Sequence, residues 1–448
     1  MSALPKAVLP DSLTLLETAS PRLGEIPLET LAADYGTPLY IMDAATVERQ
    51  ANAYHTALKQ HYPGEYQILY AAKANLTVHL AKTMHALNLA IDVVSSGELY
   101  TAQKAGLPGS AIYMNGNNKS AEEIDMALTA GIARFMVDNE EELSLIHERV
   151  KALNLGAKAN VLLRVAPGIE AHTHDYLKTG NDSNKFGMPI SQINAIVGRC
   201  LTQYADTLAL KGLHAHIGSQ IFDALPYQDL ARIMLETYDM LRQQHNGLVL
   251  PDLDLGGGAG ICYTLQDDAP ALEAVMTTLA KTVAKTATEI NYPLPRLLVE
   301  PGRSMVATAG VTLYTVGTVK TTASGRVFVA VDGGMGDNIR PALYGAQYSA
   351  IALPQGPSAE TRRAQPAQPI TLVGKYCESG DVLLTDWLAP PLQRGDLITV
   401  FGTGAYNYTM ASTYNRIGRP AMVWVSAGQS ELMLKRETLD ALLSQDVI

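Results

Sequence analysis

Residues 67–75 of the chain read Gln-Ile-Leu-Tyr-Ala-Ala-Lys-Ala-Asn, an apolar run that closes on Lys73. The run has the length and composition of a buried strand in a parallel sheet. In a barrel of parallel strands, catalytic groups lie at the C-terminal ends of the strands. An amine placed there can hold an aldehyde, so Lys73 is a candidate for Schiff-base chemistry. Most lysines are only solvated surface charges, and the hypothesis therefore depends on the rest of the chain.

Seven further strand-like runs follow, separated by stretches with helical periodicity such as 80–89 and 230–242. This alternation predicts βα units and a parallel sheet. Eight strands in succession suggest a closed (β/α)8 barrel of the TIM type. The expected strands are Gln67–Lys73, Ala90–Ser95, Ala111–Asn115, Arg134–Asp138, Ala159–Ala166, Leu210–His216, Leu253–Gly257 and Arg296–Glu300.

The pattern changes after Ser304, where apolar and polar residues alternate and Thr and Val are enriched. Such alternation predicts an all-β domain, built as a sandwich or a barrel. The strand-like Leu39-Tyr40-Ile41 precedes the first barrel strand and is expected to join the β domain. We therefore expect an α/β barrel over residues 46–305 and a β domain made of residues 306–448 and completed by residues 1–45.

Two stretches are expected to be long loops. Residues 168–191 follow the fifth strand and are polar, with His172, His174 and Lys185 among them. Long loops at this face of a barrel usually cover a site, although an ordinary surface insertion is the alternative. Residues 353–369 are rich in Pro, Gln and Ala, and we expect a mobile loop or linker there.

Composition limits the class of protein. The chain has 448 residues, enough for two domains, and a formal net charge of −10 without a basic tract, which disfavours nucleic acid as a partner. Its three cysteines, Cys200, Cys262 and Cys377, are far apart and lack metal-ligand spacing, so no disulfide framework and no metal site is expected. No signal-peptide pattern and no long apolar run occurs. We expect a cytoplasmic protein that acts on small molecules.

Three more strand ends would meet Lys73 at one barrel mouth. Glycines such as Gly256-Gly257-Gly258 let backbone N–H groups approach a phosphate, although a glycine cluster is often only a tight turn. A carboxylate such as Glu300 can keep a pyridine nitrogen protonated, or it can form a structural ion pair with Arg303. His214 and His216 share one strand face, and an isolated histidine is usually structural. The three segments are His214–Gln220, Gly256–Gly260 and Glu300–Ser304.

These segments, the run that ends at Lys73 and three later motifs resemble the fold type III pyridoxal-phosphate decarboxylases, in the family's order from about Leu39 to Val425. The discriminating motifs resemble the branch that acts on diaminopimelate, because ornithine and arginine relatives differ at them. The motifs that carry the resemblance are Tyr70-Ala71-Ala72-Lys73-Ala74-Asn75, His216-Ile217-Gly218-Ser219-Gln220, Gly256-Gly257-Gly258, Glu300-Pro301-Gly302-Arg303, Arg340-Pro341-Ala342-Leu343-Tyr344, Cys377-Glu378-Ser379-Gly380-Asp381 and Gly404-Ala405-Tyr406.

The resemblance implies pyridoxal 5'-phosphate as the cofactor. Lys73 would hold the cofactor's aldehyde, His216 would stack on its ring and Glu300 would bind its pyridine nitrogen. The residues implied to hold the phosphate are Ser219, Gly258 and Tyr406. No metal is implied.

The resemblance also implies meso-2,6-diaminopimelate as the substrate and L-lysine and carbon dioxide as products, the final step of lysine biosynthesis. Cys377 would supply a proton, and Glu378 would face the distal amine; both would come from the partner subunit of a homodimer. Arginines for one distal group and a glutamate for the other match a substrate with two amino acid ends. The residues implied to bind the substrate are Arg303, Arg340, Tyr344, Glu378 and Tyr406.

Three other functions stay open at this point. A decarboxylase for ornithine, arginine or carboxynorspermidine would share the cofactor site, but Glu378 and Arg303 argue against its distal recognition. A catalytically silent relative that regulates another subunit would usually lack Lys73, Glu300 or Cys377, and all three are present. A racemase on the same barrel would release no carbon dioxide.

Overall fold

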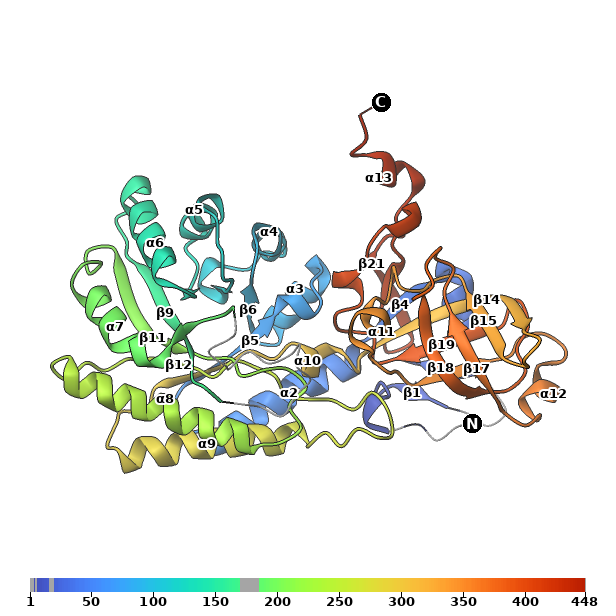
Figure 1. The fold of residues 1–448 in the computed structure, drawn as a ribbon, viewed down its shortest axis with the longest axis horizontal. Helices are drawn as coiled ribbons and strands as arrows, with labels where there is room; N and C mark the ends of the chain where they lie inside the picture. The colour runs from blue at the N-terminus through green and yellow to red at the C-terminus, as the bar shows by residue number, and fades with distance from the viewer. Residues whose placement is uncertain (1–3, 5, 16–19, 170–184, 448) are drawn as a thin grey trace. The chain divides into compact units, whose positions relative to one another are not determined.

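The computed structural model describes residues 4, 6–15, 20–169 and 185–447, and it contains two compact units (Figure 1). The barrel unit consists of Gln50–Gly260 and Ala269–Ser304. The β unit consists of Met1–Arg49, Ile261–Asp268 and Met305–Ile448. The β unit is therefore assembled from three separate segments of the chain.

Eight parallel strands close the barrel in the order β5-β6-β7-β8-β9-β11-β12-β13, with β13 paired to β5. Each strand lies where the sequence predicts one, so the predicted (β/α)8 fold is confirmed. Several strands end two or three residues earlier than predicted, because the residues that follow leave the sheet as turns. The strands are β5 (Tyr66–Ala71), β6 (Ala90–Val93), β7 (Ile112–Met114), β8 (Arg134–Val137), β9 (Ala159–Ala166), β11 (Leu208–His214), β12 (Asp252–Asp254) and β13 (Arg296–Val299).

Side-chain caps define where several barrel helices begin. The side chain of Asn139 accepts a hydrogen bond from the Glu142 backbone N–H and so caps the start of α6. The reciprocal capping box forms between Ser120 and Glu123 of α5. Within the residues that the structure describes, no helix is long and apolar enough to cross a membrane. The helices are α2 (Ala44–His61), α3 (Val78–Ala86), α4 (Ser96–Lys104), α5 (Ala121–Ala130), α6 (Glu140–Leu153), α7 (Ile193–Leu201), α8 (Leu225–Gln244) and α9 (Leu272–Glu289).

A layer of buried side chains fills the barrel, and six of its strands contribute one residue each. Layers of this kind make a barrel of this type a packed core rather than a pore. Polar groups are therefore pushed to the strand ends, where the loops begin. The layer contains Leu69, Ala90, Tyr113, Met136, Leu162 and Leu298.

The segment after β9 is described only at its two ends. The short strand β10 (Met188–Pro189) pairs in parallel with the end of β9. The guanidinium of Arg164 lies 4.5 Å from the centre of the Phe186 ring. His172 and His174, named above from the sequence, lie outside the described residues.

The β unit contains a small antiparallel sheet of β1 (Leu13–Thr14), β2 (Arg22–Leu23) and β3 (Ile26–Pro27). Nine other strands form one larger sheet with the path β18-β17-β15-β14-β4-β20-β21, in which β19 also pairs with β14 and β16. The N-terminal β4 lies between β14, which is antiparallel to it, and β20, which is parallel. The expected incorporation of Leu39-Tyr40-Ile41 into the β domain is confirmed. The strands are β4 (Leu39–Asp43), β14 (Gly310–Thr321), β15 (Val327–Val331), β16 (Ala350–Leu353), β17 (Gln368–Val373), β18 (Val382–Ala389), β19 (Leu397–Phe401), β20 (Ala421–Ser426) and β21 (Gln429–Leu434).

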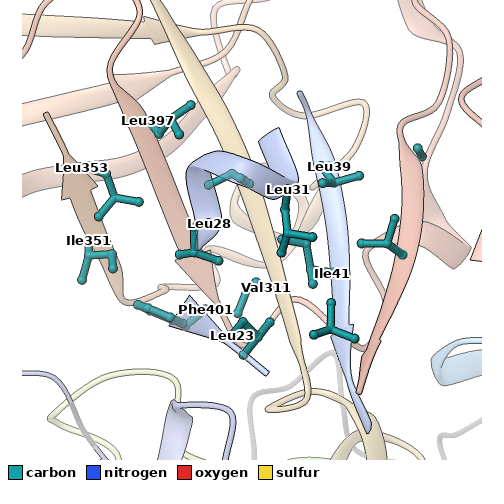
Figure 2. Close-up of a cluster of buried hydrophobic side chains, with 14 of the residues drawn as sticks. Leu23, Leu28, Leu31, Leu39, Ile41, Val311, Ile351, Leu353, Leu397 and Phe401 are labelled. Carbon is teal, nitrogen blue, oxygen red and sulfur yellow. The ribbon is translucent and has the colours of Figure 1, made fainter. Parts of the chain in front are cut away.

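Figure 2 shows the core of the β unit, where side chains from the N-terminal segment share one apolar cluster with side chains of the strands. Leu28 and Leu31 come from α1 (Leu28–Tyr35) and contact a cluster that includes Val311 and Phe401. Fully burying one such side chain contributes about 1.5–3 kcal/mol. The N-terminal segment is therefore part of this core.

The structure corrects the expectation of a mobile loop or linker at residues 353–369. This stretch contains α12 (Ala359–Arg363), whose Arg362 is buried. Its guanidinium forms an ion pair with buried Asp396 and also donates to the Gln355 carbonyl over 2.8 Å. Composition alone missed this, because a single buried arginine can anchor a segment that is otherwise polar.

Candidate active site

Lys73 lies in a 3-10 turn, Ala72–Ala74, directly after β5. The turn is anchored on both sides: the Ala71 backbone N–H donates to the Pro301 carbonyl over 2.9 Å, and the Tyr70 hydroxyl donates to the Asn75 carbonyl over 2.6 Å. Ala72 and Ala74 are buried, whereas Lys73 is exposed. The backbone of the turn is thus held, and the amine projects from it.

Glu300 follows β13, the strand next to β5, and both of its carboxylate oxygens have partners. Oε1 accepts a hydrogen bond from Asn115 Nδ2 over 2.8 Å, and Oε2 lies 3.3 Å from His214 Nε2. The same Asn115 nitrogen also donates to Asp92 Oδ1 over 2.8 Å. The Glu300 backbone N–H donates to the Gly256 carbonyl over 2.7 Å. Glu300 is therefore held at both its backbone and its side chain.

Three buried carboxyl groups, those of Asp92, Asp254 and Glu300, lie close together inside this end of the barrel. Burial raises the pKa of Asp92 and of Asp254 well above the usual range, and the charge of Glu300 raises both further. Burial also acts to raise the pKa of Glu300, but His214, His216 and the Lys73 amine outweigh it, and this pKa lies below its usual value. Neighbouring carboxyls cannot all ionise in such a site. Glu300 therefore carries the charge, and the two aspartic acids favour their protonated forms.

The turn Gly256-Gly257-Gly258 after β12 admits only glycine, because other parts of the barrel approach its backbone closely. A Cβ on Gly257 would lie 2.1 Å from the Glu300 carbonyl oxygen. A Cβ on Gly258 would lie 2.3 Å from the Gly218 carbonyl oxygen, and its φ is +108°. The glycine turn, the Glu300 strand end and the loop after β11 thus form one compact cradle.

The loop after β11 places a neutral ring beside this cradle. The Gly257 backbone N–H donates to His216 Nδ1 over 3.2 Å and so orients the imidazole. Burial, together with the positive charges of Lys73 and Arg164, holds the pKa of His216 well below its usual value. A neutral imidazole is a flat, weakly polar face on which an aromatic ring can stack.

Ser219 and Arg303 meet at the same end of the barrel. Arg303 is buried at the start of the short helix α10 (Arg303–Val306), and its Nη2 donates to Ser219 Oγ over 3.0 Å. The barrel end therefore holds an exposed amine, an ionised carboxylate, a neutral imidazole and a glycine cradle. This set of groups fits pyridoxal phosphate, which needs partners for an aldehyde, a pyridinium nitrogen, a ring face and a phosphate.

Arg340 lies in the β unit, where it begins α11 (Arg340–Tyr344). Its Nη1 donates to the Tyr348 hydroxyl over 2.6 Å, and its guanidinium lies 5.0 Å from the centre of the Tyr263 ring. Tyr344, at the other end of this helix, is exposed. Two aromatic side chains therefore fix the orientation of the arginine.

Cys377 and Glu378 lie on an exposed loop of the β unit between β17 and β18. The Cys377 backbone N–H donates to Asn415 Oδ1 over 2.8 Å. Tyr406 is half-buried and has a φ of +62°. Two residues before it, Gly404 packs tightly against the Val306 carbonyl.

Four polar residues that surround Glu300 have no role predicted from the sequence: Asp92, Asn115, His214 and Asp254. A signal was present, because Asp92 and Asp254 interrupt apolar strands and Asn115 ends one. Alternation directs such residues into the barrel, where a polar group needs a partner. The identity of the partner depends on the closed barrel, which brings β7 and β11 toward the end of β13.

Comparisons with known proteins agree with this geometry. Residues 44–307 match a family model described as the pyridoxal binding domain of pyridoxal-dependent decarboxylases. The chain is 39% identical to a diaminopimelate decarboxylase of Synechocystis sp., over 98% of this chain and 93% of the relative. It is 41% identical to a diaminopimelate decarboxylase of Bacillus subtilis, over 95% of this chain and 94% of the relative. A solved diaminopimelate decarboxylase from M. jannaschii has a TM-score of 0.87, with 33% identity and 98% of each chain covered.

Proposed function

Because the chain belongs to the diaminopimelate decarboxylases, a group of the pyridoxal-dependent decarboxylases, we propose that the barrel end around Lys73 and Glu300 is its cofactor site. The reaction converts meso-diaminopimelate into L-lysine and carbon dioxide, the final step of lysine biosynthesis, with pyridoxal 5'-phosphate as cofactor. When bound, this cofactor withdraws electrons from the carbon that loses its carboxylate. One observation carries the assignment: an exposed lysine and an ionised, doubly held carboxylate follow adjacent strands.

Each residue of the cofactor site has a distinct task in this proposal. Lys73 binds the aldehyde, and the fixed turn beneath it keeps the amine in place. Glu300 keeps the pyridine nitrogen protonated, because a buried carboxylate with a low pKa stabilises a nearby positive charge. The neutral ring of His216 stacks on the cofactor. Ser219, Gly258 and Tyr406 bind the phosphate, where the glycine lets backbone N–H groups come close.

Recognition of the substrate's distal end is assigned to cations and an acid. Planar guanidinium groups suit a carboxylate, and a glutamate suits an ammonium group. The burial of Arg340 between tyrosines supports this role, since an immobilised guanidinium loses little entropy on binding. In this proposal the substrate-binding residues are Arg303, Arg340, Tyr344, Glu378 and Tyr406.

We assign proton donation to Cys377 and assembly to a homodimer in which Cys377 and Glu378 serve the partner's site. The exposure of both residues in the single chain supports this assignment. We also propose that the enzyme acts in the cytoplasm, since its three cysteines are free thiols, as a reducing compartment requires.

The test of the cofactor site is Lys73→Ala. We expect the variant to lose turnover and the visible absorbance band of the lysine-bound cofactor, because the amine that binds the aldehyde is removed. Carbon dioxide and L-lysine release from meso-diaminopimelate is measured with added pyridoxal phosphate, with ornithine and arginine as competing substrates. Lys82→Ala, an exposed lysine of α3, is the matched control and should keep both signals. Retention of the band or of turnover in Lys73→Ala would contradict the assignment.

A further inference from the structure

His214 is a buried polar residue without a role in the proposal above. It ends β11 and is only 1% exposed. In the parallel sheet it is paired in register with Asp254 of β12 and Arg164 of β9. Burying an imidazole among polar strand ends is costly unless a partner compensates for the lost water. The partner of His214 therefore indicates what the residue does.

That partner is Glu300. His214 Nε2 lies 3.3 Å from Glu300 Oε2, while Nδ1, which is also buried, has no hydrogen-bond partner among the described residues. Because an ionised carboxylate can only accept a hydrogen bond, Nε2 must carry the proton and donate it to Glu300. Asn115 holds the other oxygen, Oε1. The two donors together fix the plane of the carboxylate.

The charged groups around His214 explain why this donor matters. Asp254 and Glu300 each offer an oxygen within 4.8 Å of one another and of a His214 ring nitrogen. Burial raises the pKa of Asp92 and Asp254, whereas contact with His214 is the largest influence that lowers the pKa of Glu300. His214 therefore favours charge on Glu300 over the neighbouring acids. Among the described residues, the other charged or titratable groups that act on this cluster are Lys73, Glu98, Asp138, Arg164, His216 and Asp252.

We propose that His214 is a positioning residue for the cofactor's pyridine nitrogen: through its Nε2–H it orients Glu300 and keeps that carboxylate as the charged member of the buried acid cluster. The inference rests on the proposed function, because it takes Glu300 as the partner of the pyridine nitrogen. His214 itself contacts the carboxylate and is assigned no contact with the substrate.

Two polar substitutions separate this role from simple packing. The amide nitrogen of His214→Gln falls near the position of Nε2 and can still donate to Glu300. The amide of His214→Asn falls near the position of Nδ1 and cannot reach Glu300 in the same way. We expect His214→Asn to lower kcat about 10–100-fold, the cost seen when a residue that orients a metal ligand is lost. His214→Gln should restore most of this loss, and the KM for meso-diaminopimelate should change little in either variant.

Cofactor binding supplies a measurement that does not depend on turnover. Each full-length apoenzyme is titrated with pyridoxal phosphate, and the pH dependence of the bound cofactor's absorbance is recorded. His214→Asn should bind the cofactor several-fold more weakly and shift this pH dependence, and His214→Gln should resemble the wild type. Thermal unfolding of the two apoenzymes compares their folding. Equal losses in both variants, or no loss in either, would overturn the proposal.

The kcat and cofactor affinity of Glu300→Gln are measured in parallel. This variant separates the assignment of Glu300 to the pyridine nitrogen from the inference about His214. If Glu300→Gln retains kcat and cofactor affinity, the assignment of Glu300 to the pyridine nitrogen is wrong, and the role of His214 falls with it. If Glu300→Gln is impaired while His214→Asn is not, only the inference about His214 is wrong.

Discussion

At the scale of single residues, Asp337 shows how burial makes one carboxyl sensitive to pH. It is 1% exposed in the β unit, and its oxygens accept hydrogen bonds from the Tyr314 hydroxyl and the Gly334 backbone N–H. Burial raises its pKa from 3.8 to about 7. The folded state therefore holds this proton more tightly than the unfolded state. The stabilising contribution is complete below pH 3.8 and is lost as the pH rises through about 7.

We predict that Asp337→Asn removes this dependence, because an amide keeps the shape of the side chain but does not titrate. The midpoint of thermal unfolding is measured from pH 5 to pH 8 for both proteins. Between these two pH values the wild type should lose about 3 kcal/mol of stability relative to the variant. Asp386→Asn, at an exposed site on β18, should follow the wild type. Parallel curves for Asp337→Asn and the wild type would contradict the prediction.

Single residues also mark the limit of what could be predicted from the sequence. Lys73 and Glu300 could be chosen because each follows an apolar strand, a relation between neighbours in the chain. Asn115 and His214 could not be assigned to Glu300, because they lie 185 and 86 positions away from it. Those contacts depend on the stagger of the strands in the closed barrel, which brings together residues that are distant in the chain.

At the scale of secondary-structure elements, Asp381 joins two loops of the β unit. Its Oδ1 accepts from the Met335 backbone N–H over 2.6 Å, in the loop that leads to α11. Its Oδ2 accepts from the Tyr376 backbone N–H over 2.8 Å, in the loop that carries Cys377. A Cβ on Gly334 would lie 2.4 Å from Oδ1, so the loops are packed directly against the carboxylate.

We predict that Asp381→Asn loosens both loops, because the amide nitrogen would face a backbone N–H instead of accepting from it. Leaving one buried donor unsatisfied costs about 1–3 kcal/mol. We expect a lower kcat and a higher KM for meso-diaminopimelate, since α11 and the Cys377 loop carry proposed substrate contacts. Affinity for pyridoxal phosphate should change less than either. An unchanged kcat and KM would show that the carboxylate is not needed to hold the loops.

The elements themselves differ in how well local sequence predicts them. The barrel strands were located because every second element is an apolar run of strand length. The prediction of a mobile loop or linker at residues 353–369 is wrong, because α12 depends on the ion pair of Arg362 with Asp396, 34 positions away. A buried ion pair leaves no periodic signal in the sequence.

At the scale of the whole molecule, the chain folds as a barrel from consecutive βα units and as a β unit from distant segments. Consecutive βα units are joined by short connections and lie next to one another in space. The architecture of the barrel therefore follows from the order of its elements in the chain. In the β unit, β4 pairs with β14 and β20, which follow it by more than 260 residues. The sequence predicted that β4 joins these strands, but the strand order within the sheet depends on tertiary packing.

The proposed homodimer leads to a prediction about the assembled protein. If each site combines Lys73 of one subunit with Cys377 of its partner, then Lys73→Ala and Cys377→Ala disable different halves of every site. A mixed dimer of the two variants then has one site with both residues intact and one with neither. Random mixing should restore about a quarter of the wild-type activity, because half of the dimers are mixed and each has one working site. Decarboxylation is measured after the two variants are co-expressed, or purified and refolded together.

The matched control mixes Lys73→Ala with Glu300→Gln. Both residues lie in the barrel unit of the same chain, so every site in every dimer lacks one of them and no activity should return. Recovery in the first mixture alone supports shared sites, whereas no recovery in either mixture would place Cys377 and Lys73 of one site on the same chain.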